Sequence, residues 1–222
     1  MAYEKKNMIQ APILSGQPEI REDGISFLRA CVSADRQGED CILRGGRASG
    51  EEFYKLSLKG VILENCVFMD CGFEKGSFVD VVFQNCDFSN CRLEDGFFNR
   101  CVLQSVKGVG ADFHESLFRE VRVEEGLFSF ANFSGTRWEN ALLSGCDLQD
   151  GYMEECGFKK TVFQSMKLNR VNFFHTSLKG IDLRGSELEG LILSEERKEL
   201  KGAVVDLYQA AELARLLGIV VK

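Results

Sequence analysis

Histidine, proline and tryptophan are scarce in this chain of 222 residues, which has two, two and one of them. No apolar run approaches the roughly 20 residues of a membrane-spanning helix, and residues 1–10 lack the apolar stretch of a signal peptide. We therefore expect a cytoplasmic protein that does not contact a membrane. With 45% hydrophobic residues, the chain is long enough to bury a sizeable core in one domain with caps.

Catalytic motifs are nearly absent as well. Residues 45–50 are glycine-rich but lack the Gly-Lys-Ser/Thr ending of a phosphate-binding loop, and Gly108-Val109-Gly110 lacks the third glycine of a dinucleotide-binding turn. Both are better explained as turn glycines. No nucleophile with an accompanying base is evident. The sequence therefore predicts no enzyme activity, no cofactor and no metal site.

What the chain does contain is a five-residue period from Phe53 to Leu193. Of the 29 positions in phase, 14 hold Phe, 11 hold Leu, three hold Val123, Trp138 or Met153, and Gly108 alone breaks the pattern. Two residues earlier the side chain is usually small, with only Glu51, Leu56, Met166, Ile181 and Leu191 as exceptions. A period of five fits neither a helix nor a strand, so a repeat architecture is indicated.

The pentads, such as Ala131-Asn132-Phe133-Ser134-Gly135 and Ile181-Asp182-Leu183-Arg184-Gly185, resemble those of pentapeptide-repeat proteins. The resemblance implies an all-β solenoid, a right-handed quadrilateral β-helix with four pentads per square coil. Residues 20 apart then stack, and the repeat predicts about seven coils at roughly 4.8 Å each. Such a stack requires caps at both ends.

All nine cysteines, from Cys31 to Cys156, share the phase of the small inward column. Stacked pairs such as Cys66 with Cys86 would lie about 4.8 Å apart, beyond the separation that a disulfide favours. We expect buried, reduced thiols. His114 and His175 face outward on one side, about three coils or roughly 14 Å apart, too far to share a metal.

We name the four faces of the rod by their first inward side chain: face 1 by Phe53, face 2 by Leu58, face 3 by Leu63 and face 4 by Phe68. Residues 51–193 carry 22 acidic against 15 basic side chains, so the net charge of -7 lies on the repeat. Outward positions of the adjacent faces 1 and 4 hold 14 acidic and 6 basic residues. Face 2 is mainly basic, with Lys59, Arg100, Arg119, Arg137, Lys159, Lys160 and Lys179. The acidic side would repel nucleic acid and attract a basic protein surface, although charge also serves solubility alone.

Four segments follow from these patterns. Residues 1–24 have no assigned role, residues 25–52 form N-terminal coils with a loop near 33–40, and residues 53–193 form the uninterrupted solenoid. Residues 194–222 form a cap and dimerisation module. There, Leu200 to Val205 complete a last strand, Asp206 begins a short helix over about Leu207 to Leu217, and Gly218 ends it. Ile219 to Val221 form a terminal strand.

The ends of the chain resemble the Qnr quinolone-resistance group of pentapeptide-repeat proteins. The matching residues are Tyr208-Gln209-Ala210 and Leu217-Gly218-Ile219, the pentad 181–185, Ser129 to Ser134, Gly110 to Phe113, and Asp35-Arg36-Gln37. The resemblance implies a homodimer through the C-terminal module and a rod that mimics duplex DNA. It also implies binding to DNA gyrase or topoisomerase IV, which protects these enzymes from quinolones. The larger loop of the Gram-negative members, between about Phe118 and Phe128, is missing here.

Two hypotheses remain: a DNA-mimicking protein that binds a type II topoisomerase, and an interaction scaffold with an unknown protein partner. Neither requires direct binding of nucleic acid. The predicted partner-binding residues are Glu74, Glu94, Asp95, Asp112, Glu115, Glu154, Glu155, Asp70, Asp87, Asp147 and Asp150. The predicted dimer interface comprises Leu207, Ala210, Ala211, Leu213, Ala214, Leu217 and Ile219.

Overall fold

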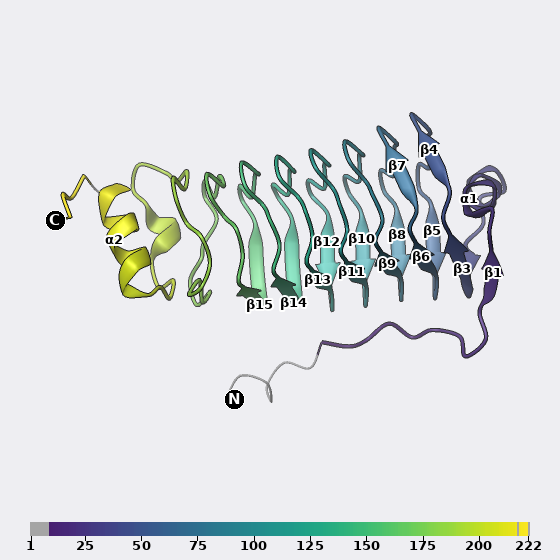
Figure 1. Cartoon of the computed structure of the whole chain (residues 1–222), viewed down its shortest axis with the longest axis horizontal. Coiled ribbons are helices and arrows are strands. Elements are labelled where there is room, and N and C mark those ends of the chain that lie inside the picture. The colour runs from purple at the N-terminus through teal and green to yellow at the C-terminus, as the bar shows by residue number, and fades with distance from the viewer. Residues whose placement is uncertain (1–8, 217, 222) are drawn as a thin grey trace.

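The computed structural model describes residues 9–216 and 218–221 and is a rod of stacked coils (Figure 1). It is a β-solenoid of about seven turns, which confirms the fold predicted from the five-residue period. Helix α1 lies at one end of the rod and helix α2 at the other (Figure 1).

Regular strands lie mainly on faces 2 and 3, while faces 1 and 4 are joined largely by isolated bridges between turns. All strand pairs are parallel. In chain order the elements are β1 (Glu19–Arg21), α1 (Gly24–Ser33), β2 (Gly38–Glu39), β3 (Cys41–Arg44), β4 (Arg47–Ser49), β5 (Ser57–Lys59), β6 (Ile62–Glu64), β7 (Val67–Met69), β8 (Ser77–Val79), β9 (Val82–Gln84), β10 (Phe97–Asn99), β11 (Val102–Gln104), β12 (Leu117–Arg119), β13 (Arg122–Glu124), β14 (Arg137–Ser144), β15 (Gly157–Gln164), the 3-10 helix η1 (Lys198–Leu200) and α2 (Leu207–Leu216).

Each coil pairs with the next at a shift of 20 residues. Phe98 of β10 lies opposite Phe118 of β12, and Phe118 lies opposite Trp138 of β14. Backbone N–H and C=O groups of successive coils form hydrogen bonds with each other. For example, the Arg100 backbone N–H donates to the Arg119 carbonyl at 3.0 Å. Because every coil repeats this shift, side chains of the same column stand directly above one another.

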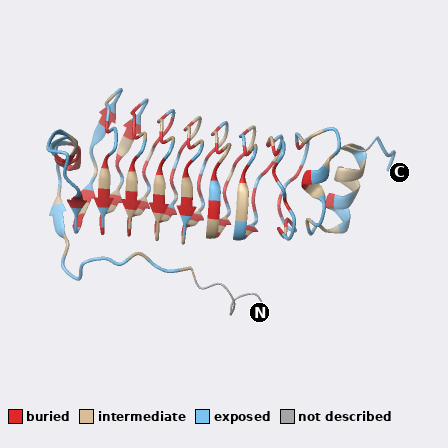
Figure 2. Cartoon of the chain, turned by 180° about the vertical axis from the view of Figure 1, so that it is seen from behind, coloured by how far each residue is buried: buried red, intermediate tan, exposed pale blue. Residues whose placement is uncertain are grey.

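The core is a stack of large side chains along the rod axis. The rings of Phe98 and Phe118 have centroids 4.7 Å apart, and Phe118 and Trp138 are 4.0 Å apart with planes inclined by 7°. The Trp138 indole N–H donates to the Thr136 hydroxyl at 2.9 Å, so its one polar atom is satisfied. Buried and exposed positions alternate around the coils (Figure 2).

Gly108, the single break in the large-residue column, is explained by its neighbour one coil on. A Cβ atom at Gly108 would come within 2.8 Å of the Phe128 ring. The Phe128 ring therefore occupies the space that a side chain at position 108 would need. The turn assignment of the other glycines also fits, since Gly45, Gly46, Gly50 and Gly110 have positive φ.

All nine cysteines are free and buried, as predicted. Six of the thiols donate to backbone carbonyls of the preceding coil, as Cys101 Sγ does to the Phe78 oxygen at 3.2 Å. Burial raises the pKa of the Cys91 and Cys101 thiols to about 12. These thiols therefore stay protonated at neutral pH and fill space in the core.

The N-terminal end differs from the expectation of coils from residue 25 onward. Helix α1 covers the end of the rod, buries Ile25, Leu28 and Cys31, and is capped by the Asp23 carboxylate, which accepts from the Ser26 N–H at 3.1 Å. Cys31 keeps the five-residue phase, but its spacing with Ile25 and Leu28 is also helical, and the helix prevails. The loop expected near 33–40 is a short turn followed by β2.

Residues 9–18, for which the sequence suggested no role, run back along the rod (Figure 1). Gln10 N–H donates to the Glu120 carboxylate at 2.9 Å, and Ile13 N–H donates to Asp80 at 3.0 Å. Asp80 is only 2% exposed and also receives two hydrogen bonds from Arg100, at 2.6 and 2.7 Å. This carboxylate thus fastens the N-terminal segment to the corner between faces 2 and 3.

The C-terminal end contains the predicted helix, with corrected surroundings. The expected strand over Leu200 to Val205 is instead η1 followed by one bridge between Asp182 and Val204. The expected terminal strand at Ile219 to Val221 is wrong, since residues 218–221 form no strand. Within the described ranges, no helix is long and apolar enough to cross a membrane.

Helix α2 is held to the last coil by Gln209. The Asp206 carboxylate accepts from the Gln209 N–H at 2.9 Å, and the Gln209 side-chain oxygen accepts from the Asp206 N–H at 2.9 Å. This reciprocal pair is a capping box. The buried Gln209 amide also donates to the carbonyls of Leu183 and Ser186, at 2.6 and 2.7 Å.

The buried Asp80 allows a test of this arrangement. Burial opposes ionisation of Asp80, but the hydrogen bonds from Arg100 and Ile13 outweigh it and hold its pKa below the usual value. Because the folded pKa is depressed, its stabilisation is present above the unfolded pKa of about 4 and is lost as the pH falls through the folded value. We predict that Asp80→Asn lowers the free energy of unfolding by about 1–3 kcal/mol at pH 7. The difference from wild type should shrink below about pH 4.

Urea denaturation at several pH values measures this difference. The matched control is Asp150→Asn, because Asp150 pairs with Arg170 in the same geometry, at 2.6 and 2.8 Å, but in an exposed position. Loss of this solvent-screened pair should lower the free energy of unfolding much less than Asp80→Asn does. Equal effects of the two substitutions would contradict the role assigned to burial at Asp80.

Candidate interaction surface

Four carboxylates converge on face 1 and its corner near the middle of the rod. Glu94 and Asp95 belong to one coil, and Asp112 and Glu115 belong to the next. Asp95 and Glu115 occupy the same corner position with φ of 56° and 57°, and both are exposed. Stacked coils place these two carboxylates about one strand spacing, roughly 4.8 Å, apart at the backbone. We call Glu94, Asp95, Asp112 and Glu115 the acidic cluster.

Several other acidic residues predicted to bind a partner are neutralised by cations of a neighbouring coil. Arg92 bridges Glu74 at 2.6 Å and Glu52 at 2.7 Å. On face 4 the pairs are Asp87 with Lys107 at 3.1 Å, Asp147 with Lys167 at 4.0 Å, and Asp150 with Arg170 at 2.6 Å. The acidic side is therefore less uniformly charged than the sequence count suggested.

The acidic cluster differs because, among the described residues, none of its four members forms an ion pair with Lys or Arg. Burial raises the pKa of the Glu94 carboxyl above its ordinary value, and the neighbouring charges of Asp112 and Glu74 act in the same direction. No Lys or Arg in the described part of the chain forms an ion pair that would offset the repulsion between these carboxylates. An approaching cation would relieve it.

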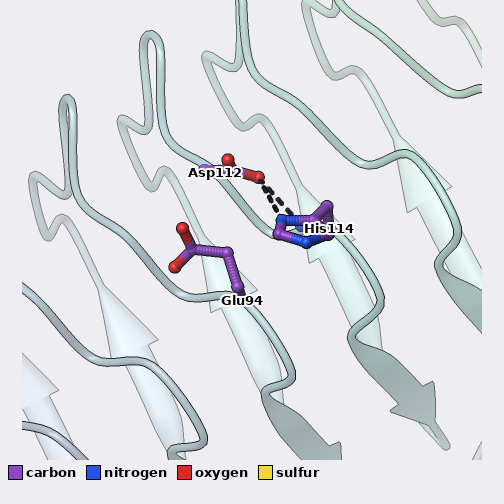
Figure 3. Close-up of side chains that lie close together, drawn as sticks. All are labelled: Glu94, Asp112 and His114. Carbon is purple, nitrogen blue, oxygen red and sulfur yellow. Dashed lines mark hydrogen bonds and ion pairs between the residues drawn. The ribbon is translucent and has the colours of Figure 1, made fainter.

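Glu94, Asp112 and His114 lie close together at one edge of this cluster (Figure 3). One donor atom from each lies within 4.8 Å of the others. His114 Nδ1 is 3.3 Å from Asp112 Oδ1, which also accepts from the Asn132 side chain at 3.0 Å. From the sequence, His114 was paired only with His175, and this group of three was not predicted. The 20-residue coil would have predicted this contact, because Glu94 and His114 are 20 residues apart and therefore stack on adjacent coils.

Glu74 lies one coil before Glu94, and the other predicted residues lie apart from the cluster. Asp70 and Glu155 are exposed in other coils, and the Glu154 carboxylate accepts from the Asn172 side chain at 2.6 Å. The structure thus brings together four of the eleven predicted partner-binding residues and distributes the other seven along the rod.

Exposed apolar side chains lie near the corner between faces 4 and 1. Leu127 of face 4 is 51% exposed, Phe130 at the corner is 59% exposed, and Tyr152 of face 1 is 48% exposed. Phe130 also adopts a positive φ of 63°, a conformation that is unusual for a bulky residue. These three residues lie on adjacent coils of the acidic side, and we call them the apolar patch.

The predicted dimer interface is only partly outward-facing in the single chain. Leu207 is 82% exposed, and Ile219 and Ala210 are exposed too. Ala211 and Ala214 are half-buried, and Leu217 lies outside the described residues. Leu213 is half-buried and packs against the core of its own chain. Tyr208 and Val220, at 84% and 80% exposed, were not predicted.

The sequence comparison agrees with the coil geometry. Residues 76–152 match a family model described as a pentapeptide repeat region. This chain contains a pentapeptide repeat region. No curated protein matches the sequence.

Solved structures are similar to this chain over a longer stretch than the family model covers. A trypsin-treated variant of QnrB1, a plasmid-mediated fluoroquinolone resistance protein, matches with a TM-score of 0.50 and 21% identity, over 82% of this chain and 99% of that one. A second trypsin-treated QnrB1 variant gives 0.48 and 20%, over 81% and 99%. HetL, a pentapeptide repeat protein involved in heterocyst differentiation regulation from the cyanobacterium Nostoc, gives 0.40 and 16%, over 81% and 95%. At such identities the first match supports the shared fold.

Proposed function

We propose that this protein acts by binding rather than catalysis, and that it binds a type II topoisomerase, DNA gyrase or topoisomerase IV. In this proposal the acidic cluster takes the place of DNA phosphates in a basic groove of the enzyme, in the cytoplasm. The observation that carries it is the set of four carboxylates on two adjacent coils that have no Lys or Arg partner among the described residues. The similarity in fold to the fluoroquinolone resistance protein QnrB1 supports the choice of partner.

The charge density of the cluster is of the right order for such mimicry. Two carboxylates per coil, with coils about 4.8 Å apart, give about one charge per 2.4 Å of rod. Duplex DNA carries about one phosphate charge per 1.7 Å of its axis. Elsewhere on this side, ion pairs such as Asp87 with Lys107 lower the density. The proposed contact is therefore centred on the acidic cluster rather than on the whole side.

A supercoiling assay with purified gyrase, with and without ciprofloxacin, tests the proposal. We predict that wild-type protein inhibits supercoiling, and that changing Glu94, Asp95, Asp112 and Glu115 to Lys weakens inhibition at least about tenfold, equivalent to about 1.4 kcal/mol of binding free energy. The physical reason is that the variant repels the basic groove. Restoration of supercoiling in the presence of the drug would extend the proposal to quinolone protection.

The matched control changes Glu124, Glu125, Glu195 and Glu196 to Lys, which alters the net charge equally but outside the cluster. Inhibition by this control should remain close to wild type. If both variants inhibit equally, long-range charge alone is responsible and the assignment to the cluster is wrong. If wild-type protein never inhibits, topoisomerase binding is wrong.

A second candidate function is an interaction scaffold for a different protein partner. The exposed apolar patch of Leu127, Phe130 and Tyr152 favours it, because apolar and aromatic side chains dominate the binding energy of protein interfaces. A partner that binds this patch should lose affinity when Phe130 is changed to Ser. The affinity of a DNA-mimicking contact centred on the acidic cluster should instead depend on charge and on salt concentration.

We further propose that two chains pair through the surface formed by α2 and the residues after it. One short helix over the end of the rod leaves Leu207, Tyr208 and Val220 largely exposed, and a second copy would cover them. We predict that wild type sediments as a dimer and that Leu207→Asp with Val220→Asp sediments as a monomer, because two buried like charges oppose pairing.

Analytical ultracentrifugation measures this difference. The control is Leu127→Asp, which adds a charge at an exposed leucine in the middle of the rod. It should leave the sedimentation coefficient unchanged. A monomeric wild type, or a dimer that survives the double substitution, would disprove pairing through this surface.

A further inference from the structure

Polar side chains on face 1 are paired between residues 18 apart in the sequence, which lie on adjacent coils. Glu74 meets Arg92 at 2.6 Å, and Glu154 meets Asn172 at 2.6 Å. In both pairs a carboxylate receives a hydrogen bond from a side chain of the next coil. The pattern supplies a donor for each of these carboxylates.

The same relationship fails at Glu94. Its counterpart 18 residues later is Asp112, a second carboxylate, in the position that Arg92 holds relative to Glu74. Glu94 Oε2 is buried and has no hydrogen-bond partner within the described residues. A buried anionic oxygen without a donor is costly, and no Lys or Arg among residues 9–216 and 218–221 forms an ion pair with it. The site therefore calls for a cation from outside.

Asp112 is oriented in a way that suits a metal ligand. Its Oδ1 accepts from the His114 N–H at 3.0 Å and from the Asn132 side chain at 3.0 Å. These contacts hold Oδ1 and so fix the orientation of the carboxylate. Hydrogen bonds from neighbouring groups that fix a ligating carboxylate are a general property of metal sites.

His114 decides which kind of cation fits. A neutral imidazole offers a nitrogen lone pair that suits Zn²⁺ and related transition metals, whereas Mg²⁺ and Ca²⁺ prefer oxygen ligands alone. A lysine or arginine side chain from a protein partner could only donate one hydrogen bond to that lone pair. Zn²⁺ binds nitrogen and oxygen at about 2.0–2.2 Å, so tetrahedral donors lie about 3.4 Å apart. The donors now lie within 4.8 Å of one another, so metal binding would require them to move closer together by at most about 1.4 Å.

We propose that Glu94, Asp112 and His114 form a binding site for a divalent transition-metal ion, with Zn²⁺ as the best match. One carboxylate oxygen from each acid and one imidazole nitrogen supply three ligands, and water completes the coordination. Because the ligands come from two adjacent coils of a stacked β-solenoid, the backbone needs no rearrangement. Binding of Zn²⁺ at this site would not require that the protein bind a topoisomerase.

Titration calorimetry of the full, EDTA-treated chain with ZnCl₂ at pH 7.5 tests the site. We expect one Zn²⁺ per chain, and a loss of affinity of at least about tenfold in His114→Asn and in Glu94→Gln, since each removes one of three ligands. Zn²⁺ should raise the melting temperature of wild type but not of His114→Asn. Circular dichroism checks that the variants remain folded.

The control is His175→Asn, because His175 also faces outward on face 1 but stacks on Phe174, with ring centroids 3.9 Å apart, outside the triad. Its Zn²⁺ affinity should equal that of wild type. A Co²⁺ spectrum should show no thiolate charge-transfer band, which distinguishes this site from the nine cysteines. Unchanged affinity in His114→Asn, equal affinity for Mg²⁺ and Zn²⁺, a thiolate band, or absence of saturable binding would each overturn the proposal.

Discussion

The parallel pairing of each coil with the next, at a constant shift of 20 residues, is the constraint on which the rest of this molecule depends. It satisfies the backbone groups between coils and places equivalent side chains in columns. The large column then becomes a continuous stack such as Phe98, Phe118 and Trp138. A rod stabilised in this way is close to one-dimensional, so its two ends need different structures from its middle.

The same shift determines the electrostatics of the surface. Charges that are far apart in the sequence become neighbours, and most of the acidic residues on faces 1 and 4 that meet a cation do so one coil away. Where the neighbour is another acid, as at Glu94 and Asp112, the two carboxylates repel each other. An external cation bound there would reduce this repulsion. The proposed protein partner, with its basic groove, and the proposed metal ion would each bring positive charge to this geometry. Their positions overlap.

The ends are determined by specific polar contacts rather than by the repeat. Asp80 fastens the N-terminal segment through the Ile13 N–H and Arg100, and Gln209 fastens α2 through two carbonyls of the last coil. Both polar side chains are buried and satisfied, which makes their geometry specific. The outer side of α2 and the residues after it keep exposed apolar side chains, among them Leu207, Tyr208 and Val220.

The five-residue period by itself determined the solenoid, the inward columns and the buried thiols, because every coil imposes the same requirement on the same positions. The helix at residues 24–33 was not predicted, since Cys31 satisfies both the repeat and a helical spacing. Counting charges identified the acidic side and included all four members of the acidic cluster. Only the tertiary structure showed which carboxylates meet an arginine or lysine and that His114 approaches Asp112, because such contacts depend on side-chain directions between coils rather than on composition.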